Sequence, residues 1–279
     1  MIRTGSDSNN WRDQTRERPS VGFTGLFNKK KHNKNSHRKK NTTYRERISL
    51  GIACCRFNGD RAEILVVRKR YTYAYCLFVQ GKYKSDNDAE LINLFNGMTV
   101  EEKLDIQSLN FTQIWYRIWL DSIRARNIYF FAKNKFESTF LADNGIRLKR
   151  LISKSSHAET IWEIPKGRKN NKNESDIHTA VREFREETGI TKKQYRICRG
   201  ANRTYSYIDD GIRYTNLYYF AYCTSNINPK IDFRLPDQVC EICDIRWMDI
   251  EMIKFADTTG RLVNTVKPIF KYMYANVKK

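Results

Sequence analysis

The chain has 279 residues, of which 40% are hydrophobic, and its 51 lysines and arginines outnumber 31 acidic residues to give a formal net charge of +20. This composition supports a packed core and excludes collagen-like, mucin-like and wholly disordered chains, while the charge indicates a polyanionic partner. There is no apolar run of the roughly 18–20 residues that span a bilayer and no signal-peptide segment, and seven irregularly spaced cysteines do not indicate a disulfide framework. We therefore expect a soluble protein of a reducing compartment.

The N-terminal residues are strongly basic. Residues 1–47 carry 13 basic and 4 acidic side chains, a net of +9, which leaves +11 on the other 232 residues. Seven basic residues fall between Lys29 and Lys40 without one acid, and apolar periodicity is absent. Such a segment cannot bury enough surface to offset the entropy of ordering it, so we predict a disordered basic tail over 1–47. Its role stays open between solubilising the chain, binding RNA or phosphate, and nuclear targeting.

Residues 48–80 have strand patterning. Apolar residues alternate from Ile48 to Cys54, and residues 63–68 are rich in β-branched and long apolar side chains. Asn58-Gly59 lies between them and tolerates the positive φ angles of a tight turn. The pattern predicts a β-hairpin that forms the N-terminal strands of the fold.

Residues 81–156 change to helical spacing. Apolar and aromatic side chains recur every three or four residues, at Leu91, Leu94, Phe95, Phe111, Ile114, Trp115, Ile118 and Trp119. Thr99 precedes Glu101 and Glu102, a pattern typical of a capped helix start. We predict a helical insertion domain over 81–156, with its aromatic face in a core rather than at a ligand site.

Strand patterning returns in residues 157–279. Four runs predict strands, at 161–164, 205–208, 213–222 and 242–248. Asp209-Asp210-Gly211 is a turn between the second and third of these strands. Residues 262–274 have the spacing of a closing helix, which Pro268 should bend or interrupt. The whole pattern predicts a mixed α/β domain that the helical block divides.

The chemistry lies in residues 167–190, GRKNNKNESDIHTAVREFREETGI. Ser175 can cap the start of a helix and Gly189 can end it. Its acids Glu183, Glu186 and Glu187 fall at i, i+3 and i+4 on one face, and such acids repel one another unless a cation lies among them. Oxygen-only ligands suit Mg²⁺ or Mn²⁺, so the pattern indicates a metal site, with a solvated acidic face as the alternative.

This segment resembles the Nudix box, Gly-x5-Glu-x7-Arg-Glu-U-x-Glu-Glu-x-Gly-U, in which U is a bulky apolar residue. The match is complete from Glu174 to Ile190, but six residues instead of five separate Gly167 from Glu174. Counting from the glycine would place Asn173 in the glutamate position. We prefer Glu174, because the helix fixes the register from its C-terminal side and a loop can absorb an extra residue.

Other segments resemble the Nudix mRNA-decapping enzymes of large DNA viruses, such as African swine fever virus and mimivirus. They are SLGIACCRFN, Lys69-Arg70-Tyr71, LINLFNGMTVEEKL, WYRIW, DNGIRLKRLI and WEIPKG. From Ile48 onward, the resemblance implies a Nudix α/β/α sandwich with a mixed sheet and a helical insertion domain. It also implies a hydrolase that uses Mg²⁺ or Mn²⁺ to remove the 5′ m7G cap of mRNA, releasing m7GDP and 5′-monophosphate RNA and promoting turnover of viral and host mRNA.

Position in the box implies a role for each residue. Glu183 is the expected catalytic carboxylate, which binds metal or activates water. The expected metal ligands are Glu174, Glu183, Glu186 and Glu187, with Asp209 as a weaker extra candidate. Lys166, Gly167 and Arg168 are expected to contact substrate phosphate. Glu241 lies where some Nudix enzymes supply another acid.

Two other functions stay open. A net charge of +11 on residues 48–279 suits a diphosphoinositol polyphosphate phosphohydrolase almost equally well. An inactive RNA-binding Nudix module is the second alternative, which the intact acids from Glu174 onward disfavour. The resemblance implies the cytoplasm of an infected host cell, with association to the endoplasmic reticulum or the virion as further options. It leaves the oligomeric state open.

Overall fold

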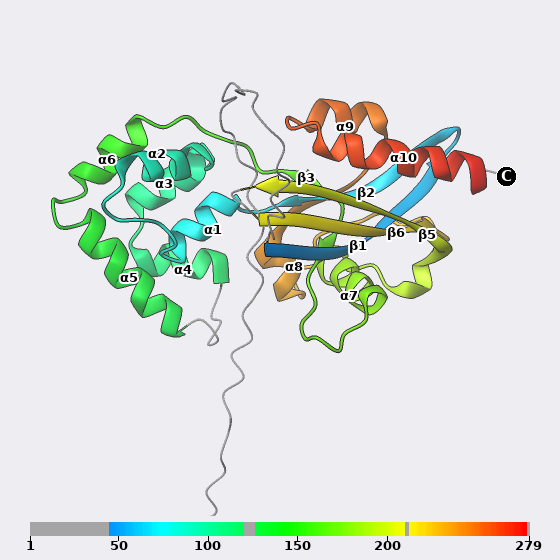
Figure 1. The fold of residues 1–279 in the computed structure, drawn as a ribbon, viewed down its shortest axis with the longest axis horizontal. Coiled ribbons are helices and arrows are strands. Elements are labelled where there is room, and N and C mark those ends of the chain that lie inside the picture. The colour runs from blue at the N-terminus through cyan, green and yellow to red at the C-terminus, as the bar shows by residue number, and fades with distance from the viewer. Residues whose placement is uncertain (1–44, 120–125, 210–211, 278–279) are drawn as a thin grey trace, which may run out of the picture.

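A mixed seven-stranded sheet and a separate block of helices make up the computed structural model, which describes residues 45–119, 126–209 and 212–277 (Figure 1). The strands are β1 (Arg45–Asn58), β2 (Arg61–Lys69), β3 (Trp162–Glu163), β4 (Lys166–Gly167), β5 (Tyr195–Asp209), β6 (Ile212–Cys223) and β7 (Ile242–Met248). Their order is β3-β2-β1-β6-β5, with β4 paired to β1 and β7 paired to β2. Among these described strands, β1 and β6 pair in parallel and the other pairs are antiparallel.

Strand β1 is the buried centre of the sheet. Its side chains alternate between two cores: Leu50 and Ile52 pack toward helix α7 (Asp176–Thr188), whereas Ala53 and Cys55 pack toward helices α9 (Ile250–Ala256) and α10 (Arg261–Asn276). Figure 1 shows α7 on one side of the sheet and α9 and α10 on the other. The sandwich of helices around a mixed sheet therefore has the predicted α/β/α class.

The first hairpin is confirmed. Strands β1 and β2 pair antiparallel up to Asn58 and Arg61, and Gly59 has a φ of +58° in the turn. The start of β1 was predicted three residues too late, because Arg45–Arg47 pair in parallel with Ile212–Tyr214 on β6. Alternation of apolar residues gives no sign of this pairing, which uses backbone groups. The rest of the predicted disordered tail, residues 1–44, lies outside the described residues.

Helices α1 to α6 form the helical domain. They are α1 (Tyr73–Val79), α2 (Asp88–Asn96), α3 (Val100–Ser108), α4 (Phe111–Trp119), α5 (Arg126–Phe140) and α6 (Ile146–Ser153). The aromatic face is a core, as predicted, with Phe78, Phe95 and Phe140 among its fully buried side chains. The helices begin at Tyr73 rather than at Gly81, because α1 contributes Phe78 to this same core.

Glu102 ties the helical domain to the end of β2. The predicted cap at Thr99 is confirmed: it forms a capping box with Glu102 at the start of α3. The buried Glu102 carboxylate also accepts hydrogen bonds from the backbone N–H and the hydroxyl of Thr72, both at 2.6 Å. One side chain thus joins the start of α3 to the start of α1, where the chain leaves the sheet.

The C-terminal half differs from the prediction in several places, among them helix α9 and a short helix before β7, neither of which was predicted. Strand β5 begins at Tyr195, ten residues before the predicted start, because a register shift between Ile197 and Asn202 hides the alternation. Helix α10 runs unbroken through Pro268, since its apolar face packs on the sheet and outweighs one lost hydrogen bond. Strand β7 has the predicted bounds, and helix α8 (Pro236–Glu241) precedes it. No helix of the described residues is both long and apolar enough to cross a membrane.

Candidate active site

Helix α7 brings the box acids to the sheet. Both predicted caps are confirmed: Ser175 Oγ accepts from the N–H of His178 at 3.4 Å, and Gly189 ends the helix with a φ of +71°. Ala180 and Phe184 are fully buried against β1, which fixes the rotation of the helix. The acidic face is therefore turned toward the short strand β4 and the loop that follows it.

Gly167 allows the backbone of β4 to lie directly against the carboxylate of Glu183. A Cβ at Gly167 would stand 2.1 Å from the carboxyl carbon of Glu183, well inside van der Waals contact. Strand β4 cannot move away easily, because Gly167 and Lys166 pair with Leu50 and Gly51 of the central strand. The close approach therefore requires glycine at this position.

Replacing Gly167 by alanine is thus expected to displace the Glu183 carboxylate and to lower turnover by about 100-fold or more, because a misplacement of about 1 Å has an effect of this size. Gly200→Ala is the control for backbone strain, because Gly200 has a positive φ of +67° that strains any alanine, whereas the added Cβ would have no atom within 4 Å. Steady-state rates for Gly167→Ala and Gly200→Ala would test this, and equal rates in the two variants would contradict it.

Arg182 gathers three carboxylates around one guanidinium. Its Nε lies 2.8 Å from Glu174, and its Nη1 lies 2.7 Å from Glu183 and 2.9 Å from Glu186. Its Nη2 donates to the backbone oxygen of Arg168 at 2.8 Å, which fixes the loop after β4. The hydrogen bond from Arg182 lowers the pKa of Glu174 to about 2. Arg182 thus compensates part of the negative charge of these three acids and orders the loop.

A second cationic centre lies deeper, at the end of β2. The Nζ of Lys69 lies 2.5 Å from Oε1 of the buried Glu187, 3.4 Å from Glu163 and 3.7 Å from Glu241. The other oxygen of Glu187 accepts the backbone N–H of Lys166 at 3.1 Å, and the Lys166 ammonium pairs with Glu163. Burial alone would lower the pKa of Lys69, but these carboxylates raise it well above its usual value. Lys69 and Lys166 therefore compensate the charges of the two buried carboxylates, Glu187 and Glu163.

Two of the box acids, Glu183 and Glu187, have strongly raised pKa values. Burial raises the pKa of Glu183 from 4.5 to about 7, although Arg182 opposes the shift and Glu187 adds to it. Burial likewise raises the pKa of Glu187 to about 7, with Lys69 opposing. A further cation beside these two carboxylates would offset the cost of burying their charges and would lower both pKa values.

Without metal, these two acids should make the protein less stable as the pH rises from 4.5 to about 7. In this window the folded chain binds more protons than the unfolded chain, so the free energy of unfolding falls with increasing pH. Glu174, whose pKa is about 2, titrates below the window. Urea denaturation in EDTA at pH values across this window would measure the slope, which Glu183→Gln should reduce. A stability that rises through the window would contradict the assignment.

The donor chemistry fits a hard divalent cation, because every candidate ligand offers carboxylate oxygen. Within residues 45–119, 126–209 and 212–277, no three His, Cys, Asp or Glu side chains stand together in an arrangement that could hold a metal ion. The carboxylates are instead held by Arg182 and Lys69. A metal would fit here once these two side chains release their partners.

Comparison with known proteins identifies the family. A NUDIX domain model matches residues 142–266. The chain is 36% identical to the mRNA-decapping protein g5R of African swine fever virus over 217 residues, which cover 75% of this chain and 87% of that protein. The chain belongs to the Nudix family of phosphoanhydride hydrolases.

Two further relatives are more distant. A putative mRNA-decapping protein of Acanthamoeba polyphaga mimivirus is 26% identical to this Nudix hydrolase over 232 residues, which cover 73% of this chain and 62% of that protein. Among solved structures, a C. elegans Ap4A hydrolase binary complex aligns with a TM-score of 0.42 and 15% identity, over 82% of this chain and 97% of that chain.

The structure brings part of the predicted Nudix set together. Glu183, Glu187, Lys166 and Gly167 surround one point beside β4. Glu186 shares the Nη1 of Arg182 with Glu183, whereas Glu174 binds the Nε and Nη2 of Arg182. The roles of Glu174 and Glu186 as ligands stay predictions. The Arg168 side chain is half-buried, whereas the side chain of Asp209, at the end of β5, lies outside the described residues. Glu241 lies within reach of Lys69.

Sequence reasoning missed Lys69 and Glu163 as members of the site. Both lie in segments that carry the family resemblance, Lys69-Arg70-Tyr71 and WEIPKG, but neither has a spacing relative to the box helix that predicts a contact. Their proximity follows from the pairing of β3 with β2, which aligns Glu163 with Val67. The resemblance of these two segments was the available signal.

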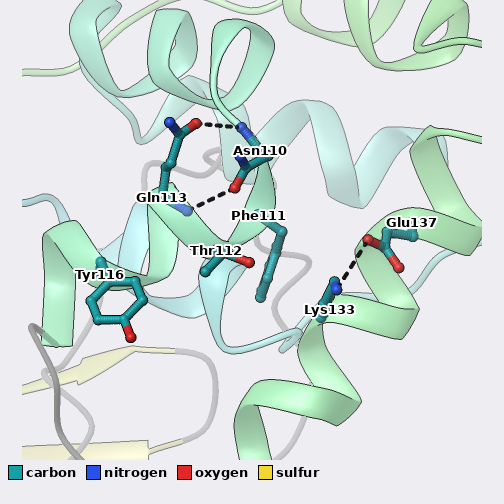
Figure 2. A pocket seen from close by; sticks show the side chains of 7 residues that line it. All are labelled: Asn110, Phe111, Thr112, Gln113, Tyr116, Lys133 and Glu137. Atoms are coloured by element: carbon teal, nitrogen blue, oxygen red, sulfur yellow. Dashed lines mark hydrogen bonds and ion pairs between the residues drawn. The ribbon is translucent and has the colours of Figure 1, made fainter.

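A separate hollow of about 490 Å³ lies in the helical domain, between α4 and α5 (Figure 2). Phe111 and Tyr116 line it, and none of the predicted Nudix site residues does. The side-chain oxygens of Asn110 and Gln113 each accept the backbone N–H of the other residue at 3.0 Å at the start of α4. This hollow is therefore lined by residues of the helical domain and not by those of the box.

Proposed function

We propose that this Nudix hydrolase removes the 5′ m7G cap of mRNA with Mg²⁺ or Mn²⁺, releasing 7-methyl-GDP and 5′-monophosphate RNA. The observation that carries the proposal is the 36% identity to an mRNA-decapping protein over 87% of its length. Such an enzyme would promote turnover of viral and host mRNA. We further propose that it acts in the cytoplasm of the infected cell.

Glu183, Glu186 and Glu187 are the proposed metal-binding residues, and Glu174 could join them after releasing Arg182. Asp209 stays a weaker candidate. When bound, a divalent cation neutralises phosphate charge and lowers the pKa of a water molecule. The Glu183 carboxylate, which lies against Gly167, would in this proposal orient the attacking water and accept its proton.

The loop after β4 supports binding of a phosphate chain. Lys166 and Gly167 present a backbone edge next to Glu183, and the Arg168 side chain follows them. Burial and the nearby guanidinium of Arg47 lower the pKa of Arg168, so its charge is poorly compensated. A substrate phosphate would supply the missing negative charge. The same chemistry suits the triphosphate bridge of a cap and the phosphates of a diphosphoinositol polyphosphate.

Three substrates tested in parallel would decide between the functions. Cap-labelled RNA, free cap dinucleotide and a diphosphoinositol polyphosphate would be incubated with Mn²⁺ and the wild-type protein, and the products separated by chromatography. We expect 7-methyl-GDP from RNA. Turnover of the inositol phosphate alone would replace the proposal by the phosphohydrolase, and binding of RNA without turnover of any substrate would indicate an inactive RNA-binding module.

A further inference from the structure

Lys69 has three carboxylates within reach of its ammonium group, and two of them, Glu187 and Glu163, are largely buried. We propose that Lys69 is a positioning residue that binds Glu187 in the metal-free site and transfers to Glu163 when Glu187 takes a divalent cation. The inference rests on the proposed metal-dependent function. It assigns a role to Lys69 and Glu163, which lie outside the Nudix box.

The end of β2 aims Lys69 into the site. The register between β2 and β7 shifts between Arg68 and Lys69, so that Lys69 pairs with Ile242 and Cys243 is passed over. Such a bulge changes the local twist and can redirect a side chain. The backbone N–H of Lys69 is held by the oxygen of Ile161 at 3.1 Å. Its side chain is 12% exposed, so the ammonium group is confined among the acids.

Glu163, the carboxylate to which the Lys69 ammonium would transfer, already lies close to it. Lys69 Nζ lies 2.5 Å from Glu187 Oε1 and 3.4 Å from Glu163 Oε1. This Glu163 oxygen is buried, and among the described residues it makes no hydrogen bond of ordinary geometry beyond this long contact with Lys69. A buried carboxylate oxygen without a partner is costly, and a movement of about 0.5 Å would bring the ammonium within ordinary hydrogen-bonding distance of it. Transfer of Lys69 thus frees Glu187 and satisfies Glu163 in one step.

The charges of the cluster make Lys69 a competitor of the metal. Glu163 and Glu187 are compensated by Lys69 and Lys166, and Glu241 lies at the exposed rim, 3.7 Å from Lys69. Removal of the Lys69 charge leaves Glu187 unpaired, so that a divalent cation should bind it more tightly. Removal of the Glu163 charge has the opposite effect, because the ammonium then has no buried anionic partner other than Glu187.

Titration of the full-length protein with Mn²⁺, followed by electron paramagnetic resonance of the free ion, measures this competition without substrate. Lys69→Met should bind Mn²⁺ about tenfold more tightly than the wild type, and Glu163→Gln about tenfold more weakly. Lys69→Arg, which keeps the charge, should stay closer to the wild type than Lys69→Met does. Lys254→Met removes a lysine charge from an exposed pair with Glu251 on α9 and should change nothing.

Opposite shifts in the two variants separate this role from a structural one, which would lower the melting temperature of both without moving their Mn²⁺ affinities in opposite directions. If Lys69→Met does not fold, Glu163→Gln alone decides, and unchanged or tighter Mn²⁺ binding in it would overturn the inference. Unchanged affinity in Lys69→Met would also overturn it. A wild type that binds no Mn²⁺ would instead remove the proposed metal site itself.

Discussion

Glu183→Gln should hydrolyse capped RNA about 10²–10⁴-fold more slowly than the wild type, the range typical for loss of a positioned acid or base. Glutamine keeps the shape of the side chain and removes the negative charge that faces Gly167. It cannot accept a proton from water. Single-turnover rates with cap-labelled RNA in excess Mn²⁺ would measure the loss, because they exclude effects on product release.

Glu251→Gln is the matched control for this experiment. It makes the same chemical change at a carboxylate that is 72% exposed on α9 and pairs only with Lys254 among the contacts found in the described residues. Its rate should equal that of the wild type. If Glu183→Gln kept more than about a tenth of wild-type activity, the catalytic role of Glu183 would be wrong.

Arg182→Met should lower the free energy of unfolding. It removes the shared partner of Glu174, Glu183 and Glu186. Breaking a buried pair from one side costs about 3–5 kcal/mol. Because Arg182 is 22% exposed, we expect a smaller loss of about 2–3 kcal/mol in the free energy of unfolding. Urea denaturation in EDTA would measure this loss.

Mn²⁺ should restore part of the stability of Arg182→Met, because the cation would compensate the same carboxylates. Arg234→Met is the control, since Arg234 is 89% exposed and pairs with Asp232 at the surface. This variant should unfold like the wild type to within about 0.5 kcal/mol. An Arg182→Met protein that is fully stable in EDTA would show that the three acids do not depend on Arg182.

Features set by neighbouring residues could be predicted from the sequence. The turn at Gly59, the capping box at Thr99 and the left-handed end of α7 at Gly189 each depend on a few residues in one short segment. The start of β1 at Arg45 and the first half of β5 depend on backbone pairing with β6 instead. Such pairing leaves little trace in the pattern of apolar residues.

The candidate site likewise combines features set by neighbouring residues with features set by the pairing of distant strands. Helical spacing places Glu183 and Glu187 on one face, and the box defines their register. Lys69 and Glu163 join them only because β2 and β3 pair. The position of Lys69 also needs the register shift against β7. The counter-charges of the site therefore come from contacts that are distant in sequence, whereas its acids come from one helix.

The metal dependence of cap cleavage tests the account most directly. The protein would be stripped with EDTA, and Mn²⁺ would be added back in steps with cap-labelled RNA present. The account predicts no product without metal and release of 7-methyl-GDP that rises with Mn²⁺ and saturates. Equal cleavage with and without EDTA, or no cleavage at any Mn²⁺ or Mg²⁺ concentration, would contradict it.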